Sequence, residues 1–141
     1  MYLDSAYIAK LYLNEPDSHA VRERVRGADS LISSAWSIGE VTCAFHRHLR
    51  QGELNPPQLR ELLRVFHDHI ERKILTLVPV SQQLLKRVSL RMGRIPAEVY
   101  LRAGDAVQLA SAQEVGEIEV WTSERHMLAG ASYFGLAGRK A

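Results

Sequence analysis

The sequence predicts an α/β domain with a mainly parallel central sheet, because short apolar runs alternate with longer segments of helical periodicity. The run Leu75–Val78 is typical of a buried strand closed by Pro79. The segment from Leu59 to Ile70 carries apolar residues at the i, i+3, i+4 and i+7 positions of one helix face. In sheets of this class, ligands bind beyond the carboxyl ends of the strands. The residues that follow each predicted strand are therefore the first candidates for a functional site.

The first half of the chain predicts two strands and four helices. Helix boundaries are indicated by Pro16, by glycines at the ends of periodic segments, and by Pro56 near the first position of a helix. In chain order we expect a strand at Tyr2–Leu3, a helix over 5–13, a helix from Asp17 or Ser18 to about Gly27, a strand at Leu31–Ser33, a helix from about Trp36 to Arg50, and a helix that begins at Asn55-Pro56.

The second half alternates in the same way. Ser81 predicts the N-cap of a helix, and the stretch from Gly93 to Pro96 ends it. In chain order we expect the strand Leu75–Val78, that helix, an alanine-rich helix starting near Asp105, a strand at Ile118–Thr122, a short helix, and a last strand at Tyr133-Phe134.

Length and composition restrict the class of protein. The 141 residues predict one domain over residues 1–141, and the formal charge of +2 means that any nucleic-acid surface must come from local clustering of basic residues. The single cysteine, Cys43, excludes an internal disulfide, and we expect it to be a small buried residue. We find neither a signal peptide nor an apolar stretch long enough to span a membrane, so a cytoplasmic location is expected.

Four acidic residues lie at or near predicted helix starts, and three of them follow predicted strands. They are Asp4, Glu40, Asp105 and Glu124. In a parallel sheet these positions share one edge, so the four carboxylates are expected to converge there. Converging carboxylates repel one another, and a hard divalent cation such as Mg²⁺ or Mn²⁺ is the natural compensation. With a phosphodiester substrate, such an ion activates water for hydrolysis.

Each acid also has a purely structural interpretation. Asp4 and Asp105 have the residue type of a helix N-cap. Ser37 and Glu40 match the S-x-x-E capping box, and Glu124 in a first helical turn suits the helix dipole. Only the joint pattern favours a metal site.

Four blocks, in order along the chain, resemble the PIN-domain nucleases, specifically the small VapC-type toxins of prokaryotic toxin–antitoxin pairs. The most specific is the Arg-x-x-Asp-Ala-x-x-Leu-Ala-x-Ala pattern within Leu101–Ala112. The others are Tyr2–Ser5, Ser37–Val41 and Val120–Arg125, and the closing Gly135-Leu136 also fits. Together these blocks span nearly the whole chain.

The resemblance implies a three-layer α/β/α fold and hydrolysis of RNA with Mg²⁺ or Mn²⁺. By position, Asp4, Glu40 and Asp105 match the central acids of the family, whereas Glu124 stands where relatives usually have Asp. Thr122 or Ser123 matches a supporting hydroxyl position, with Ser5 beside Asp4, and Gln108 stands where many relatives have His. The resemblance further implies a cognate antitoxin protein and a homodimer.

We therefore expect Asp4 and Asp105 to bind the principal metal and Glu40 to bind it directly or through water. Glu124 is expected to hold a second, more weakly bound metal or to orient the attacking water. Because water is the nucleophile, the reaction needs no side-chain nucleophile. The expected contacts to RNA phosphates come from basic residues, namely Lys10, Arg87, Arg91, Arg94 and Arg102, which we place near the acidic mouth.

Other classes of function fit less well. A receiver-type phosphoacceptor domain needs an acidic pair after the first strand, where this chain has Asp4-Ser5. Nucleotide-binding glycine motifs and the G-x-S-x-G elbow are absent, and the histidine spacing does not match a zinc site. A PIN-like module that binds RNA or protein without cleavage remains the alternative, because Glu124 departs from the family pattern.

Overall fold

The computed structural model describes residues 1–141, which form five strands, seven α-helices and one 3₁₀ helix. In chain order these elements are β1 (Tyr2–Leu3), α1 (Ser5–Tyr12), α2 (Ser18–Val25), β2 (Leu31–Ser34), α3 (Ser37–Arg50), α4 (Pro56–Glu71), β3 (Leu75–Val78), α5 (Gln82–Met92), α6 (Ala103–Glu114), β4 (Glu119–Trp121), α7 (Arg125–Gly130), η1 (Ala131–Phe134) and β5 (Ala137–Arg139).

The strands form a single parallel sheet in the order β3-β2-β1-β4-β5. The short central strand β1 pairs with β2 through Tyr2 and Ile32 and with β4 through Leu3 and Trp121. From β1 the chain proceeds outward to β2 and β3, and it later returns to the other side of β1 with β4. The strand order therefore reverses between β1 and β4, which is where open α/β sheets bind their ligands.

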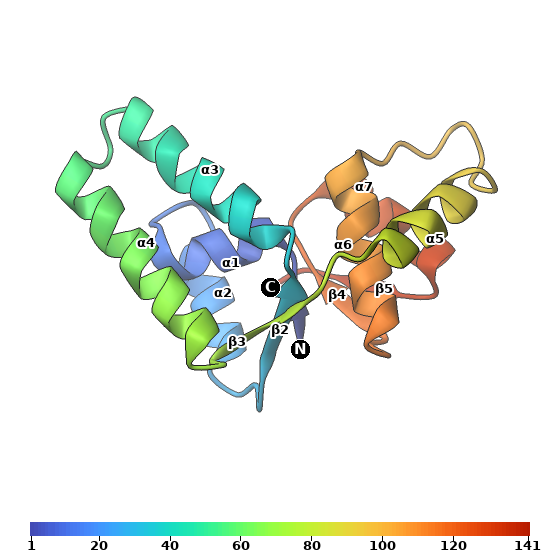
Figure 1. Cartoon of the computed structure of the whole chain (residues 1–141), viewed down its shortest axis with the longest axis horizontal. Coiled ribbons are helices and arrows are strands. Elements are labelled where there is room, and N and C mark those ends of the chain that lie inside the picture. Colours follow the sequence, from blue (N-terminus) through green and yellow to red (C-terminus); the bar gives the residue numbers. More distant parts are fainter.

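Helices cover both faces of the sheet, which gives the expected three-layer α/β/α fold (Figure 1). Alternate residues of a strand point to opposite faces, so Tyr2 packs into one core cluster and its neighbour Leu3 into the other. The cluster around Leu3 contains residues of α1 to α4, and the cluster around Tyr2 contains residues of α5, α6, α7 and η1. Because β1 is buried on both sides, the residue that follows it is held rigidly.

The last predicted strand was wrong. Tyr133 and Phe134 belong to the 3₁₀ helix η1, in which Phe134 is buried in the core, and the fifth strand is Ala137–Arg139 beside β4. Gly135 has a φ of 72°, a left-handed conformation that ends η1 and turns the chain into β5. The aromatic pair was misread as a strand, because the true strand, Ala-Gly-Arg, carries no large apolar side chain that would mark it in the sequence.

Cys43 was also predicted wrongly. It lies on the outer face of α3 and is exposed, because the buried face of that helix is formed by Ser37, Val41, Phe45 and His48. None of the helices has the length and apolar character needed to cross a membrane.

Candidate active site

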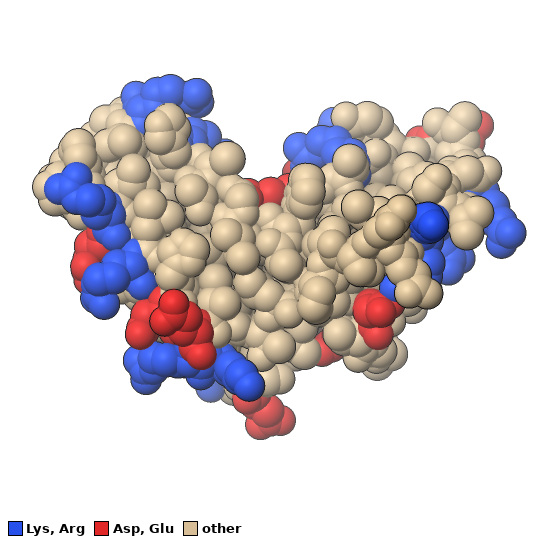
Figure 2. All heavy atoms as spheres, viewed as in Figure 1, with Lys and Arg blue, Asp and Glu red and all other residues tan.

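A cavity of about 250 Å³ opens at the carboxyl ends of β1 and β4, between α1 and α3 on one side and α6 and α7 on the other. All four acids predicted from the sequence line it, namely Asp4, Glu40, Asp105 and Glu124. In Figure 2 the molecule is hollowed between its two lobes, with acidic atoms at the floor of the hollow and basic side chains on both sides. The topology thus gathers acids that are distant in the sequence.

Asp4 is the most enclosed of these acids. It is the N-cap of α1, and its Oδ1 accepts a hydrogen bond of 2.8 Å from the backbone N–H of Tyr7. The other oxygen, Oδ2, accepts a 2.5 Å hydrogen bond from the hydroxyl of Thr122. Only 3% of Asp4 is exposed. Asp4 therefore both caps a helix and presents its carboxylate at the cavity.

Burial changes the acidity of this carboxyl. Removal from water, together with the charge of nearby Glu40, raises the pKa of Asp4 from 3.8 to about 6. The hydrogen bonds from Thr122 and Tyr7 oppose the rise, as does the charge of Lys10. At neutral pH the carboxylate is still ionised, so a cation that enters the cavity finds it charged.

Thr122 connects Asp4 to the fourth acid. The Thr122 hydroxyl, which is fully buried, accepts a 2.9 Å hydrogen bond from the backbone N–H of Glu124 while it donates to Asp4. Glu124 is the N-cap residue of α7, rather than part of its first turn, and its side chain is 32% exposed. The end of β4 thereby fixes the start of α7 relative to the end of β1.

Glu40 belongs to a buried polar network and not to the capping box that its sequence matches. The N-cap of α3 is Trp36, which makes no side-chain capping bond, and the Ser37 hydroxyl bonds those of Ser5 and Ser33. Glu40 Oε2 instead accepts hydrogen bonds from Ser5 Oγ at 2.5 Å and from Gln108 Nε2 at 3.2 Å. The capping-box interpretation fails because Ser37 faces the interior.

Gln108 is the centre of that network. Its side-chain N–H₂ also donates to Ser5 at 2.6 Å and to Ser37 at 3.0 Å, and its Oε1 accepts from the Tyr2 hydroxyl at 2.8 Å. Every buried side-chain nitrogen or oxygen in the protein has a hydrogen-bond partner. The network therefore fixes Glu40 against the floor of the cavity.

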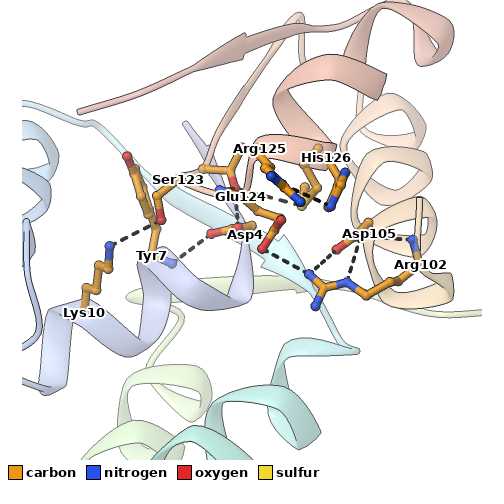
Figure 3. Close-up of polar contacts among 11 residues, drawn as sticks. Asp4, Tyr7, Lys10, Arg102, Asp105, Ser123, Glu124, Arg125 and His126 are labelled. Carbon is orange, nitrogen blue, oxygen red and sulfur yellow. Dashed lines mark hydrogen bonds and ion pairs between the residues drawn. The ribbon is translucent and has the colours of Figure 1, made fainter. Parts of the chain in front are cut away.

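Asp105 and Glu124 share one arginine (Figure 3). Asp105 accepts from the backbone N–H of Arg102 at 3.0 Å and from the guanidinium at 3.1 and 3.2 Å. The same guanidinium reaches Glu124 Oε2 at 3.1 Å. The helix α6 begins at Ala103, two residues earlier than predicted, so Asp105 reaches back to cap it. Arg102 is the positive charge between these two carboxylates.

Sequence reasoning missed two charged residues of the cavity, Glu15 and Arg47. Glu15 follows α1, and its Oε1 accepts hydrogen bonds from Arg47 at 2.7 Å and from His48 at 2.9 Å. Arg47 lies seven residues after Glu40 on α3, on the same helix face. That spacing was a usable signal for Arg47, whereas Glu15 lies in a loop and belongs to no motif.

The predicted basic residues separate into three groups. Arg102 lines the acidic cavity. Arg87, Arg91 and Arg94 line a different cavity, of about 210 Å³, between α5, α6 and η1. Lys10 is buried and donates to Ser123 Oγ at 3.2 Å, as Figure 3 shows. The expected basic stripe at the acidic mouth is therefore reduced to Arg102.

Comparison with known proteins gives the family. A family model described as PIN domain matches residues 1–131, which is nearly the whole chain. The chain belongs to the PIN domain family. The blocks that suggested this resemblance are those that supply the acids of the cavity.

One relative supports this assignment by sequence, and two solved structures share the fold. The chain is 35% identical over 116 residues to Ribonuclease VapC46 of Mycobacterium tuberculosis, a match that covers 82% of this chain and 76% of that protein. Its fold matches the crystal structure of M. tuberculosis VapC20, a Sarcin-Ricin loop cleaving toxin, with a TM-score of 0.69 at 13% identity over 92% of this chain and 93% of that one. FitAB bound to an IR36 DNA fragment matches with a TM-score of 0.64 at 15% identity, over 99% and 93%.

The donor chemistry of the PIN-domain cavity suits a hard divalent cation. Its candidate ligands are carboxylate oxygens, and two of the acids, Asp4 and Asp105, are nearly buried. No three of the acids stand close enough to form a ready-made cation site. Arg102 occupies the space between Asp105 and Glu124, so closure around a cation requires this side chain to move.

Proposed function

We propose that this PIN-domain chain is a ribonuclease that depends on Mg²⁺ or Mn²⁺ and acts as the toxin of a VapBC-type toxin–antitoxin pair. The observation that carries the proposal is the convergence of Asp4, Glu40, Asp105 and Glu124 on one cavity at the switch point of the sheet. The 35% identity to a protein named as a ribonuclease supports the choice of RNA.

In this proposal Asp4 and Asp105 hold the principal cation, and Glu40 assists directly or through water. When bound, Mg²⁺ or Mn²⁺ lowers the pKa of water toward neutrality and stabilises the charge that develops on the phosphate. Thr122 keeps the Asp4 carboxylate oriented, and Ser5 with Gln108 does the same for Glu40. The side chain of Glu124 is 32% exposed, so it is more open to solvent than Asp4 and Asp105, which suits a weaker ligand or a group that orients water.

Arg102 has a second role in this proposal. Its guanidinium side chain is 55% exposed at the cavity and carries N–H donors that suit a phosphate oxygen. With a cation held by Asp105 and Glu124, the Arg102 guanidinium would no longer be needed to neutralise them and would be available to the substrate. We further propose that the chain acts as a single PIN-like domain over residues 1–141 and forms a homodimer. A cognate antitoxin would bind the toxin and block its acidic cavity.

The test is an RNA cleavage assay on structured RNAs with Mg²⁺, with Mn²⁺ and with a chelator. We expect chelator-sensitive cleavage that is lost in both Asp4→Asn and Asp105→Asn. Asp29→Asn, which changes an exposed acid outside the cavity, is the matched control and should cleave normally. If the protein bound RNA but cleaved it under none of the metal conditions, the proposed enzyme would be wrong and the chain would be an RNA-binding module.

A further inference from the structure

The acidic cavity continues into a second, open cavity on the outer face of α3. This second cavity, of about 680 Å³, shares Glu40, Ala44 and Arg47 with the acidic one. It extends along the helix past Cys43 and His46 to Arg50. The two cavities are therefore one groove whose floor changes from acidic at β1 to basic at the end of α3.

Arg47 stands at the junction of the two parts. Its guanidinium is held by one hydrogen bond of 2.7 Å to Glu15, which is itself bonded to His48, and its side chain is 49% exposed. A guanidinium has five N–H donors, and this anchor uses one of them. Arg47 is thus held in place and still has donors free for a ligand in the groove.

Arg50 lies one helical turn farther along the same face. Arg50 is exposed and forms no ion pair with any other residue of the protein. The axial distance from Glu40 to Arg50 is about 15 Å at a rise of 1.5 Å per residue. A groove of this length and charge suits a flexible polyanion that has one phosphodiester at the acids and others at the arginines.

We propose that single-stranded RNA flanking the cleaved bond lies along the outer face of α3, with Arg47 and Arg50 contacting its phosphates. This proposal rests on the ribonuclease function proposed above and adds the path of the substrate. It places the flanking contacts on α3. The sequence had suggested five other basic residues, three of which line a separate cavity, namely Arg87, Arg91 and Arg94. Basic side chains stand on the α3 side of the hollow in Figure 2.

Affinity measurements test the role of Arg50. The full chain with Asp4→Asn, which prevents cleavage, is titrated against a fluorescent single-stranded RNA in Mg²⁺. Adding Arg50→Gln should weaken binding about threefold or more and lower the slope of log affinity against log salt by about one. Arg60→Gln on α4 is the matched control, because it removes an exposed arginine that lines neither cavity. Equal affinities for the two variants would overturn the proposal.

The single cysteine provides an independent readout, since Cys43 is exposed inside this groove. Bound RNA should slow the reaction of Cys43 with a thiol reagent severalfold, and the Arg50→Gln variant should need more RNA for the same protection. Undiminished reactivity in an RNA-saturated protein would contradict the α3 path. If the wild-type chain cleaves RNA while both measurements fail, only this path is wrong; if it neither binds nor cleaves RNA, the ribonuclease proposal fails too.

Discussion

The hydroxyl of Thr122 donates a 2.5 Å hydrogen bond to the carboxylate of Asp4 and joins residues that are 118 positions apart in the chain. Thr122 follows β4 and Asp4 follows β1, and these strands are neighbours at the point where the strand order reverses. The contact therefore depends on the parallel pairing of β1 and β4. Because the same hydroxyl accepts a hydrogen bond from the backbone N–H of Glu124, it connects Asp4, the most buried acid of the cavity, to Glu124.

Thr122→Val removes this hydrogen bond with little change in shape. Because the bond lowers the pKa of Asp4, we expect the pKa to rise in the variant and the affinity for Mn²⁺ at neutral pH to fall. Asp4 Oδ2 also loses its hydrogen-bond partner while Oδ1 keeps the bond from Tyr7 N–H, which should cost about 1–3 kcal/mol of the free energy of unfolding. Calorimetric titration with Mn²⁺ and urea unfolding measure the two effects. Thr122→Ser keeps the hydroxyl and should remain close to the wild type; a valine variant with wild-type Mn²⁺ affinity would contradict the prediction.

The raised pKa of Asp4 predicts a dependence of stability on pH. Its folded pKa of about 6 lies above the 3.8 of an unperturbed carboxyl, so the folded state holds this proton more tightly. The resulting stabilisation is complete below the unfolded pKa and is lost as the pH rises through about 6. Two pKa units correspond to about 3 kcal/mol between these limits.

Urea unfolding in a chelator, from about pH 4 to pH 7.5, isolates this contribution when the wild type is compared with Asp4→Asn. The asparagine variant does not titrate at this position, so its stability relative to the wild type should increase as the pH rises. A difference between the two proteins that stays constant over this range would show that Asp4 titrates near its ordinary pKa.

The sequence was sufficient to predict the acids that follow strands, for a physical reason. Parallel strands place their carboxyl ends at one edge, so Asp4 and Glu124 were expected to be close once β1 and β4 were recognised. Asp105 does not follow a strand directly, and its prediction depended on its place at a predicted helix start together with the family motif. Glu15 lies in a loop and is held by tertiary contacts, such as the hydrogen bond from Arg47 of α3, which no local pattern encodes.

The orientation of helices was the harder problem. Residues 105–112 of α6 are all buried, so the helix has no polar stripe from which its facing direction follows. Arg87, Arg91 and Arg94 were expected near the acidic mouth, because they belong to a basic stripe that leads up to Arg102 in the sequence. They instead line a cavity against the other end of α6 and Phe134. Sequence proximity to a site therefore did not predict which wall of the site a helix forms.

Arg102→Gln is expected to increase the affinity for Mn²⁺ about threefold, because it removes a cation that competes for Asp105 and Glu124. The same change should weaken RNA binding, since a phosphate-binding donor is lost. Calorimetric titration with Mn²⁺ measures the first effect. Arg87→Gln, which removes an arginine paired with Glu114 outside the acidic cavity, is the control. Weaker Mn²⁺ binding in the Arg102 variant would mean that the arginine orients Asp105 for the metal.

A substitution at Gly104 should displace Glu40 with little effect on the stability of the fold. A Cβ at this residue would lie 2.6 Å from Glu40 Oε1 and 3.1 Å from Trp36 Nε1. Both atoms are at the far ends of side chains, so Gly104→Ala should be accommodated by displacement of Glu40, with a change of less than about 1 kcal/mol in unfolding free energy. RNA cleavage should nevertheless fall at least tenfold if Glu40 assists the cation from its present position.

Gly39→Ala is the matched control for this substitution. Gly39 lies next to Glu40 on α3, and a Cβ there meets nothing within 4 Å, so alanine should stabilise the helix by about 0.5–1 kcal/mol without moving the glutamate. Thermal unfolding and RNA cleavage of the two variants distinguish a lost ligand from a weakened fold. If Gly104→Ala retained full cleavage with Glu40 displaced in a crystal structure, Glu40 would have no part in binding the metal. If Gly39→Ala lost cleavage as well, a change in α3 itself would explain both results, and the position of Glu40 would not be the cause.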